Sequence, residues 1–68
     1  MARELAVNSS AIESATYDLT SGDLVVNFHS GATTTYGNVP PDVVLELEVA
    51  PSSGRYFNQN IRGQFPEK

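Results

Sequence analysis

The fold of this 68-residue chain is decided by residues 17–36, which read YDLTSGDLVVNFHSGATTTY. Two turn signals, Ser21-Gly22 and Ser30-Gly31, each separate runs of residues that favour β-strands. They predict two consecutive hairpins. The chain is therefore expected to form a three-stranded antiparallel meander, with strands at about residues 12–19, 24–29 and 32–38.

The strand register follows if each Ser-Gly pair is a two-residue hairpin loop. The predicted opposing pairs are Leu19–Leu24 and Tyr17–Val26 in the first hairpin, and Phe28–Thr33 and Val26–Thr35 in the second. Because side chains alternate along a strand, five large apolar groups then share one face: Tyr17, Leu19, Leu24, Val26 and Phe28. The other face is predicted to be mostly polar and to include Tyr36. The alternation breaks upstream, which predicts a β-bulge near Glu13-Ser14.

Two short helices are predicted to follow the strands and to pack on one face of the sheet. The first begins at Pro40-Pro41 and stops before Pro51. The second has its N-cap at Ser52 or Ser53 and ends at Gly63. The residues expected to face the sheet are Val43, Val44, Leu47 and Ala50 in the first helix and Tyr56, Phe57 and Ile61 in the second, with Asn60 projecting toward this side. The predicted fold class is α+β.

The chain is predicted to be a single domain over residues 1–68, with loose or edge-lying residues 1–10 and a C-terminus that frays except where Phe65 docks. Leu45 and Val49 fall on the far flank of the first helix. Either the second helix or another chain must cover them, so the prediction leaves open both a monomer and a homodimer.

Composition excludes several kinds of site. The absence of cysteine excludes disulfides and thiolate metal sites, and a single histidine excludes a multi-histidine metal site. The net charge of −4 weighs against non-specific nucleic-acid binding, which depends on phosphate neutralisation. The N-terminus does not resemble a signal peptide and no segment is apolar enough to span a membrane, so we expect a cytoplasmic protein.

No residue pattern predicts a catalytic centre, a cofactor or a metal site. His29 lies near a hairpin tip, and no strong pattern places a nucleophile beside it. Asp42, Glu46 and Glu48 are better interpreted as a solvated helix face than as ligands of a hard cation. The protein is predicted not to be an enzyme.

The most suggestive surface is a helix face with Arg55, Gln59 and Arg62 at positions i, i+4 and i+7, and Asn58 at its edge. Paired guanidiniums suit the recognition of phosphate or carboxylate. The alternative is an ordinary exposed helix face. Tyr36 could stack on a base or a partner, or could pack on Val25.

The chain also resembles the KTSC domain, which occurs at the C-terminus of some lysyl-tRNA synthetases and as stand-alone bacterial and phage proteins of about this length. The resemblance covers residues 9–66. Its elements are Ser9-Ser10-Ala11-Ile12, Tyr17-Asp18, the Gly22 turn before Leu24-Val25-Val26-Asn27-Phe28, the Gly31 turn, Tyr36 with Val39-Pro40, and Ala50-Pro51-Ser52-Ser53-Gly54-Arg55-Tyr56-Phe57-Asn58 with Ile61-Arg62. The family often carries a Tyr-x-Tyr motif, of which this chain has Tyr36 but Thr34 at the first position.

The synthetase context of the resemblance suggests RNA as a ligand. We therefore predict a non-enzymatic binding module that binds RNA weakly, with Arg55, Gln59, Arg62 and Tyr36 as the candidate binding residues. The alternative is a protein–protein interaction module that binds no nucleic acid, which the acidic net charge favours.

Overall fold

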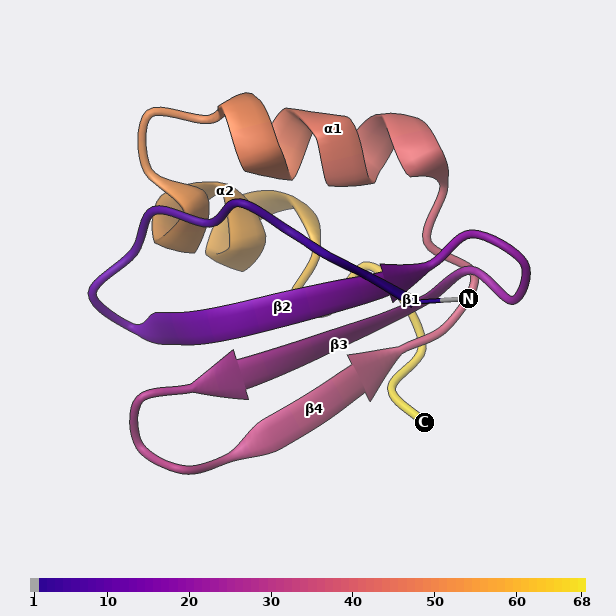
Figure 1. Ribbon diagram of the computed structural model, residues 1–68, viewed down its shortest axis with the longest axis horizontal. Coiled ribbons are helices and arrows are strands. Elements are labelled where there is room, and N and C mark those ends of the chain that lie inside the picture. Colours follow the sequence, from indigo (N-terminus) through magenta and orange to yellow (C-terminus); the bar gives the residue numbers. More distant parts are fainter. Residues whose placement is uncertain (1) are drawn as a thin grey trace.

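The computed structural model describes residues 2–68. The elements are β1 (Ala2–Glu4), β2 (Ile12–Asp18), β3 (Asp23–Phe28), β4 (Thr33–Tyr36), α1 (Pro41–Val49) and α2 (Ser53–Asn60). The strands form one antiparallel sheet in the order β1-β2-β3-β4, and both helices cover the same face of it (Figure 1). The predicted α+β class, with a meander followed by two helices, is confirmed. The sheet has one strand more than predicted.

The additional strand is β1, which pairs with β2 at the edge of the sheet so that Ala2 lies opposite Asp18. Its three residues are all exposed, and the first buried residue of the segment is Leu5, whose backbone N–H donates to the carbonyl of Ala15 over 2.8 Å. A strand with no buried side chain has no apolar alternation. The pairing of its backbone is therefore invisible in the sequence pattern.

The first hairpin is closed by a longer loop than predicted. Asp18 lies opposite Asp23, and Tyr17 lies opposite Leu24. The Asp18 carboxylate accepts from the N–H of Thr20 over 2.9 Å, and Gly22, with φ +78°, donates its N–H to the carbonyl of Asp18 over 2.7 Å. The aspartate therefore helps to set this turn. The predicted pairs Leu19–Leu24 and Tyr17–Val26 are wrong, and Leu19 is 68% exposed in the loop.

The second hairpin differs from the prediction by one residue. Val26 lies opposite Thr34 rather than Thr35, and Leu24 lies opposite Tyr36. A slip of one residue exchanges the two faces of a strand. As a result Tyr36 lies on the apolar face with 2% of its surface exposed, and its predicted place on the polar face is wrong. Burial of the large ring against the helices favours the observed register.

The core lies between the sheet and the helices. The bulge predicted near Glu13-Ser14 is confirmed as a register shift between Ile12 and Ser14. The buried apolar residues are Leu5, Ile12, Ala15, Tyr17, Leu24, Val26, Tyr36, Val39, Val44, Leu47, Phe57 and Ile61. Helix α1 contributes Val44 and Leu47, as predicted, but α2 does not cover Leu45 or Val49, which are 57% and 75% exposed.

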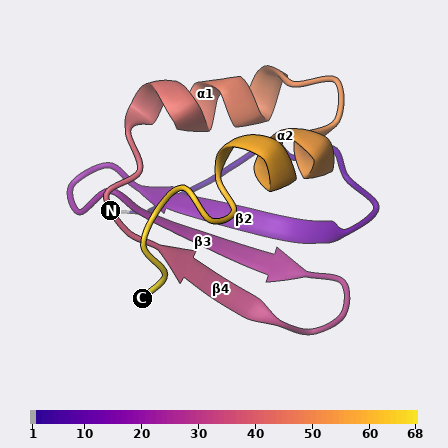
Figure 2. The same cartoon turned by 180° about the vertical axis from the view of Figure 1, so that it is seen from behind.

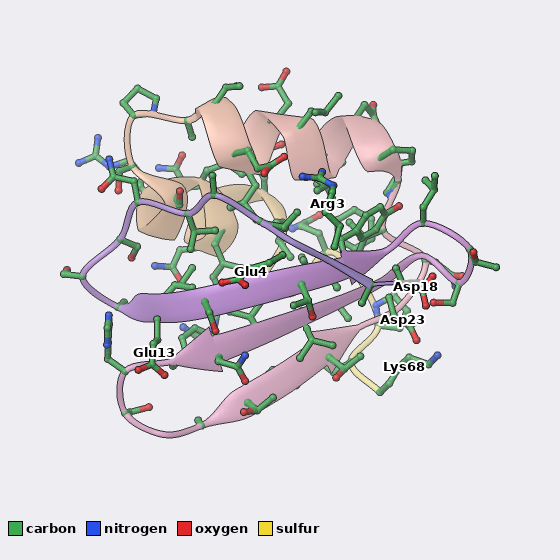
Figure 3. The ribbon with its side chains drawn as sticks, in the orientation of Figure 1. Arg3, Glu4, Glu13, Asp18, Asp23 and Lys68 are labelled. Carbon is green, nitrogen blue, oxygen red and sulfur yellow. The ribbon has the colours of Figure 1, made fainter. Side chains whose placement is uncertain are left out.

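Among residues 2–68, two ion pairs tie the ends of the chain to the body of the domain. Arg3 extends from β1 toward α1 and pairs with Glu48 over 3.1 Å (Figure 3). Lys68 pairs with Asp23 over 3.0 Å (Figure 3). The last residues do not fray as expected, because Gly37 donates its N–H to Pro66 over 2.8 Å and Lys68 donates its N–H to Thr35 over 2.7 Å.

Candidate functional site

Helix α2 is held by a cap and by aromatic packing. The Ser52 hydroxyl accepts from the N–H of Arg55 over 3.3 Å, so Ser52 rather than Ser53 is the N-cap. Phe57 contacts the rings of Phe28 and Tyr36 edge-on, each at a centroid distance of 5.6 Å. The inward side of α2 is thus fixed to β3 and β4. The opposite side is free to face solvent.

Arg55 and Gln59 lie on this opposite side, and Arg62 follows the α2 C-cap, Ile61. These three predicted residues, here called the arginine face, are all exposed. Arg62 donates to the Asn58 side-chain oxygen over 3.4 Å. Within residues 2–68, neither arginine forms an ion pair, whereas Arg3 and Lys68 both do. Both guanidiniums of the arginine face are therefore available to an anionic partner. Asn60 is exposed and donates to the carbonyl of Tyr56 over 3.2 Å, so its predicted inward direction is wrong.

The structure divides the arginine face between two hollows. Arg55 and Gln59 line a hollow of about 250 Å³ with Pro51 and Tyr56, here called the α1–α2 hollow. Arg62 lines another of about 410 Å³, here called the β4 hollow, together with Tyr36, Thr34, Phe28, Ala32 and Glu67. The division arises because α2 ends at Asn60 and the N–H of Arg62 donates to the carbonyl of Phe57 over 2.9 Å, a wider turn than the α-helical one.

Tyr36 belongs to the β4 hollow despite its burial. Its hydroxyl has no hydrogen-bond partner among residues 2–68, and no fully buried polar side-chain atom in this part of the chain lacks one. The hydroxyl oxygen is therefore not fully buried, and Tyr36 lines the hollow. Burial raises the pKa of Tyr36 and so does the negative charge of Glu67, while the positive charge of Arg62 lowers it. Both charged groups thus act on the tyrosine.

Glu67 reaches the hollow because the C-terminal segment returns to β4. In Figure 2 this segment, drawn in yellow, descends from α2 to the end of β4. Glu67 forms an antiparallel bridge with Tyr36. Since opposed residues of antiparallel strands place their side chains on the same face, Glu67 lies on the helix side of the sheet beside the tyrosine. Glu67 was not among the predicted site residues because no sequence pattern signals a single bridge.

Thr34 precedes Tyr36 by two residues and lines the same hollow. It occupies the place where the resemblance expects the first tyrosine of the pair. A tyrosine at this position would occupy part of the hollow that the smaller Thr34 side chain lines. The departure from the motif therefore shapes the hollow of this chain.

Ser53 and Gly54, which belong to the residues that carry the KTSC resemblance, have a structural role. The Ser53 hydroxyl, fully buried, accepts from the N–H of Asn8 over 2.8 Å and donates to the carbonyl of Leu47 over 3.2 Å. A Cβ on Gly54 would lie 2.6 Å from the Ser9 hydroxyl oxygen, so only glycine fits this approach without a shift. These residues join the N-terminal segment to the turn between the helices.

The other polar candidates occupy separate places. His29 is exposed at the tip of the β3–β4 hairpin. Glu48 accepts from Arg3 and from the N–H of Ala6 over 3.0 Å, and these hydrogen bonds, the one from Arg3 first, lower its pKa. In residues 2–68 no cluster of three or more histidines and carboxylates could hold a metal ion, and no helix is long and apolar enough to cross a membrane.

These features define a class of protein: a small α+β domain with two open hollows beside its last helix. The model of the KTSC domain family matches residues 8–65, which is most of the chain. The chain belongs to the KTSC family.

Several proteins support this assignment. A KTSC domain protein from Yersinia pestis, solved by crystallography, superposes with a TM-score of 0.90 at 31% identity, covering 100% of this chain and 96% of its own. An uncharacterised protein of Stutzerimonas stutzeri is 44% identical over 91% of this chain and 87% of its own length. A lysine–tRNA ligase of Nostoc punctiforme is 39% identical over 82% of this chain, but the match covers only 10% of the ligase.

Proposed function

We propose that this KTSC domain is a non-enzymatic binding module that binds single-stranded RNA on the arginine face. The observation that supports this proposal is a difference in ion pairing among the basic side chains. Arg3 and Lys68 are held in ion pairs, whereas the two arginines without an ion pair within residues 2–68 are both exposed, Arg55 on α2 and Arg62 just after its C-cap. Guanidinium groups bind phosphates and stack on unpaired bases.

Two further observations favour this function. Lysine–tRNA ligases carry a similar domain in about a tenth of their length, and tRNA is the RNA in their name. His29, the only histidine, is exposed at a hairpin tip, and its side chain forms no hydrogen bond within residues 2–68. A binding role in a reducing, cytoplasmic setting is consistent with a chain that has no cysteine.

The test is a salt titration of RNA affinity. A fluorescein-labelled octamer of single-stranded RNA is titrated with the protein at low and at physiological salt, and anisotropy is recorded. Because the net charge is −4, binding is expected to be weak and to fall steeply with salt. The double variant Arg55→Ala/Arg62→Ala should remove it while keeping the parent's melting temperature. Equal affinity of parent and double variant would eliminate the arginine face as the site.

A second candidate is a protein-interaction module, favoured by three exposed large apolar side chains. Leu19 and Leu45 line a third hollow of about 380 Å³ with Arg3 and Pro41, and Val49 lies one turn further along α1. The partner in this second proposal is another copy of the chain. Sedimentation over a hundredfold concentration range tests it: a monomer throughout would reject self-association, and a dimer that Leu45→Ser dissolves would support it.

A further inference from the structure

The β4 hollow is lined by a tyrosine, Tyr36, whose hydroxyl stabilises no other part of the fold within residues 2–68. Tyr36 has only 2% of its surface exposed, yet its hydroxyl has no hydrogen-bond partner within residues 2–68. By contrast, the hydroxyl of Tyr17, another buried tyrosine, donates to the carbonyl of Val39 over 2.7 Å. A tyrosine hydroxyl at the surface of a hollow, beside charged groups, is placed to bond a ligand.

The hollow also brings opposite charges to one place. Arg62 offers paired N–H donors and Glu67 offers paired acceptor oxygens. Their charges act on the Tyr36 hydroxyl in opposite directions, so both lie within electrostatic reach of it. Within residues 2–68, Arg62 and Glu67 nevertheless form no ion pair with each other. A ligand that fits must present acceptors to one side and donors to the other.

The remaining wall is suited to a flat ring. Phe28, Ala11 and Ala32 supply apolar surface, and Ser30 and Thr34 supply hydroxyl groups. The volume of about 410 Å³ lies within the range of roughly 300–1,000 Å³ that small-ligand sites occupy. Unpaired bases are commonly recognised by aromatic contact together with hydrogen bonds to their edges.

We propose that the β4 hollow binds one unpaired guanine base of an RNA strand. Guanine presents the acceptors O6 and N7 to a guanidinium on one edge. It presents N1–H and N2–H₂ as adjacent donors on another edge, where a carboxylate can accept both. None of the other three RNA bases combines these two edges. This inference rests on the proposed function and adds a base preference to it, with Arg62 and Glu67 as the residues that read the base and Tyr36 as a supporting contact.

Base analogues provide the test. The probes are uridine octamers that carry one central guanosine, inosine, 7-deazaguanosine or adenosine, measured by anisotropy at low salt. Inosine lacks the 2-amino donor and 7-deazaguanosine lacks the N7 acceptor. Each should bind about three- to tenfold more weakly than the guanosine octamer, as expected for one lost hydrogen bond. The adenosine octamer should bind no better than either.

Three variants with matched controls assign the preference to the hollow. Tyr36→Phe and Glu67→Gln should each reduce the preference for guanosine, and Ala32→Trp should obstruct the hollow and abolish it. The controls are Tyr56→Phe, Glu46→Gln and Thr33→Trp, which make comparable chemical changes outside the hollow. They should keep the preference. If the controls change it as much as the hollow variants do, the assignment is overturned.

The outcomes separate the two proposals. Equal affinity for all four octamers, with binding still lost in Arg55→Ala/Arg62→Ala, would overturn the guanine site and keep RNA binding. If no octamer binds, the proposed function fails, and guanosine 5′-monophosphate is then titrated into ¹⁵N-labelled protein. Shifts confined to Phe28, Tyr36, Arg62 and Glu67 would support a guanine site without RNA binding. No shift at millimolar nucleotide would overturn the site as well.

Discussion

The two hollows beside α2 each contain one candidate arginine, but they differ in what surrounds it. In the α1–α2 hollow, Arg55 and Gln59 lie beside Pro51 and Tyr56, and the ring of Tyr56 supplies apolar surface. In the β4 hollow, Arg62 lies with a carboxylate and a buried tyrosine whose hydroxyl is unpartnered within residues 2–68. Of these two hollows, the second combines hydrogen-bond donors, hydrogen-bond acceptors and aromatic side chains.

The difference shows that helical spacing alone does not make a site. Arg55 and Arg62 share a stripe in the sequence, but the wide turn after Phe57 directs the second arginine toward β4. There the C-terminal segment contributes Glu67. We therefore expect Arg55 to contribute charge to RNA binding and Arg62 to contribute both charge and base contact.

The largest expected effect concerns Phe57, which packs against two residues that line the β4 hollow. Phe57→Ala removes the ring that contacts both Phe28 and Tyr36. A buried phenylalanine changed to alanine costs about 3–5 kcal/mol, which is comparable with the whole stability of about 3–5 kcal/mol expected of so small a domain. The variant should be largely unfolded in a thermal melt followed by circular dichroism. A cooperative melt close to the parent's would show that Phe57 is not part of the core.

A smaller effect distinguishes the two buried tyrosines. Tyr17→Phe loses the hydrogen bond to the carbonyl of Val39 and should destabilise the fold by about 1–2 kcal/mol. Tyr36→Phe loses no bond within the described residues and should change the free energy of unfolding by no more than about 0.5 kcal/mol. Urea denaturation measures both. A Tyr36→Phe variant as destabilised as Tyr17→Phe would mean that the Tyr36 hydroxyl serves the fold.

The arginines should differ in affinity for RNA. Arg62→Ala should weaken binding of a guanosine-containing octamer about tenfold or more, because it loses the base contact as well as the charge. Arg55→Ala should weaken binding of every octamer about equally and flatten the salt slope by about one unit. Anisotropy titrations at three salt concentrations separate the two. Identical effects of both variants on all octamers would remove the distinction between the hollows.

The smallest expected effect concerns the ion pair between Arg3 and Glu48. The pKa of Glu48 is lowered by its hydrogen bonds from Arg3 and Ala6, so the folded state releases this proton more readily than the unfolded state. Its stabilising contribution is complete above the ordinary carboxyl pKa of 4.5 and is lost as the pH falls through the lower folded-state value. Glu48→Gln should reduce the drop in melting temperature between pH 6 and pH 3. An unchanged drop would show that the pair with Arg3 does not affect folding.

The sequence allowed the second helix and its stripe of Phe57 and Ile61 to be predicted, because apolar spacing reports directly on a buried helix face. It misplaced Tyr36 because the turn residues do not fix loop length, and a slip of one residue exchanges the faces of β4. It missed Glu67 because a contact between distant backbone segments leaves no local pattern. Arg55 and Gln59 were placed on the same exposed face as Arg62, but their separation into two hollows depends on the geometry of one turn.

The most direct test of RNA binding on the arginine face is a map of backbone amide shifts. ¹⁵N-labelled protein at low salt is titrated with the uridine octamer that contains one guanosine. We predict that the largest shifts lie at Arg62, Tyr36 and Glu67, with smaller shifts at Arg55 and none at the exposed Leu45 and Val49. Shifts centred on Leu45 and Val49, or no shift at any residue, would contradict the assignment of RNA binding to the arginine face.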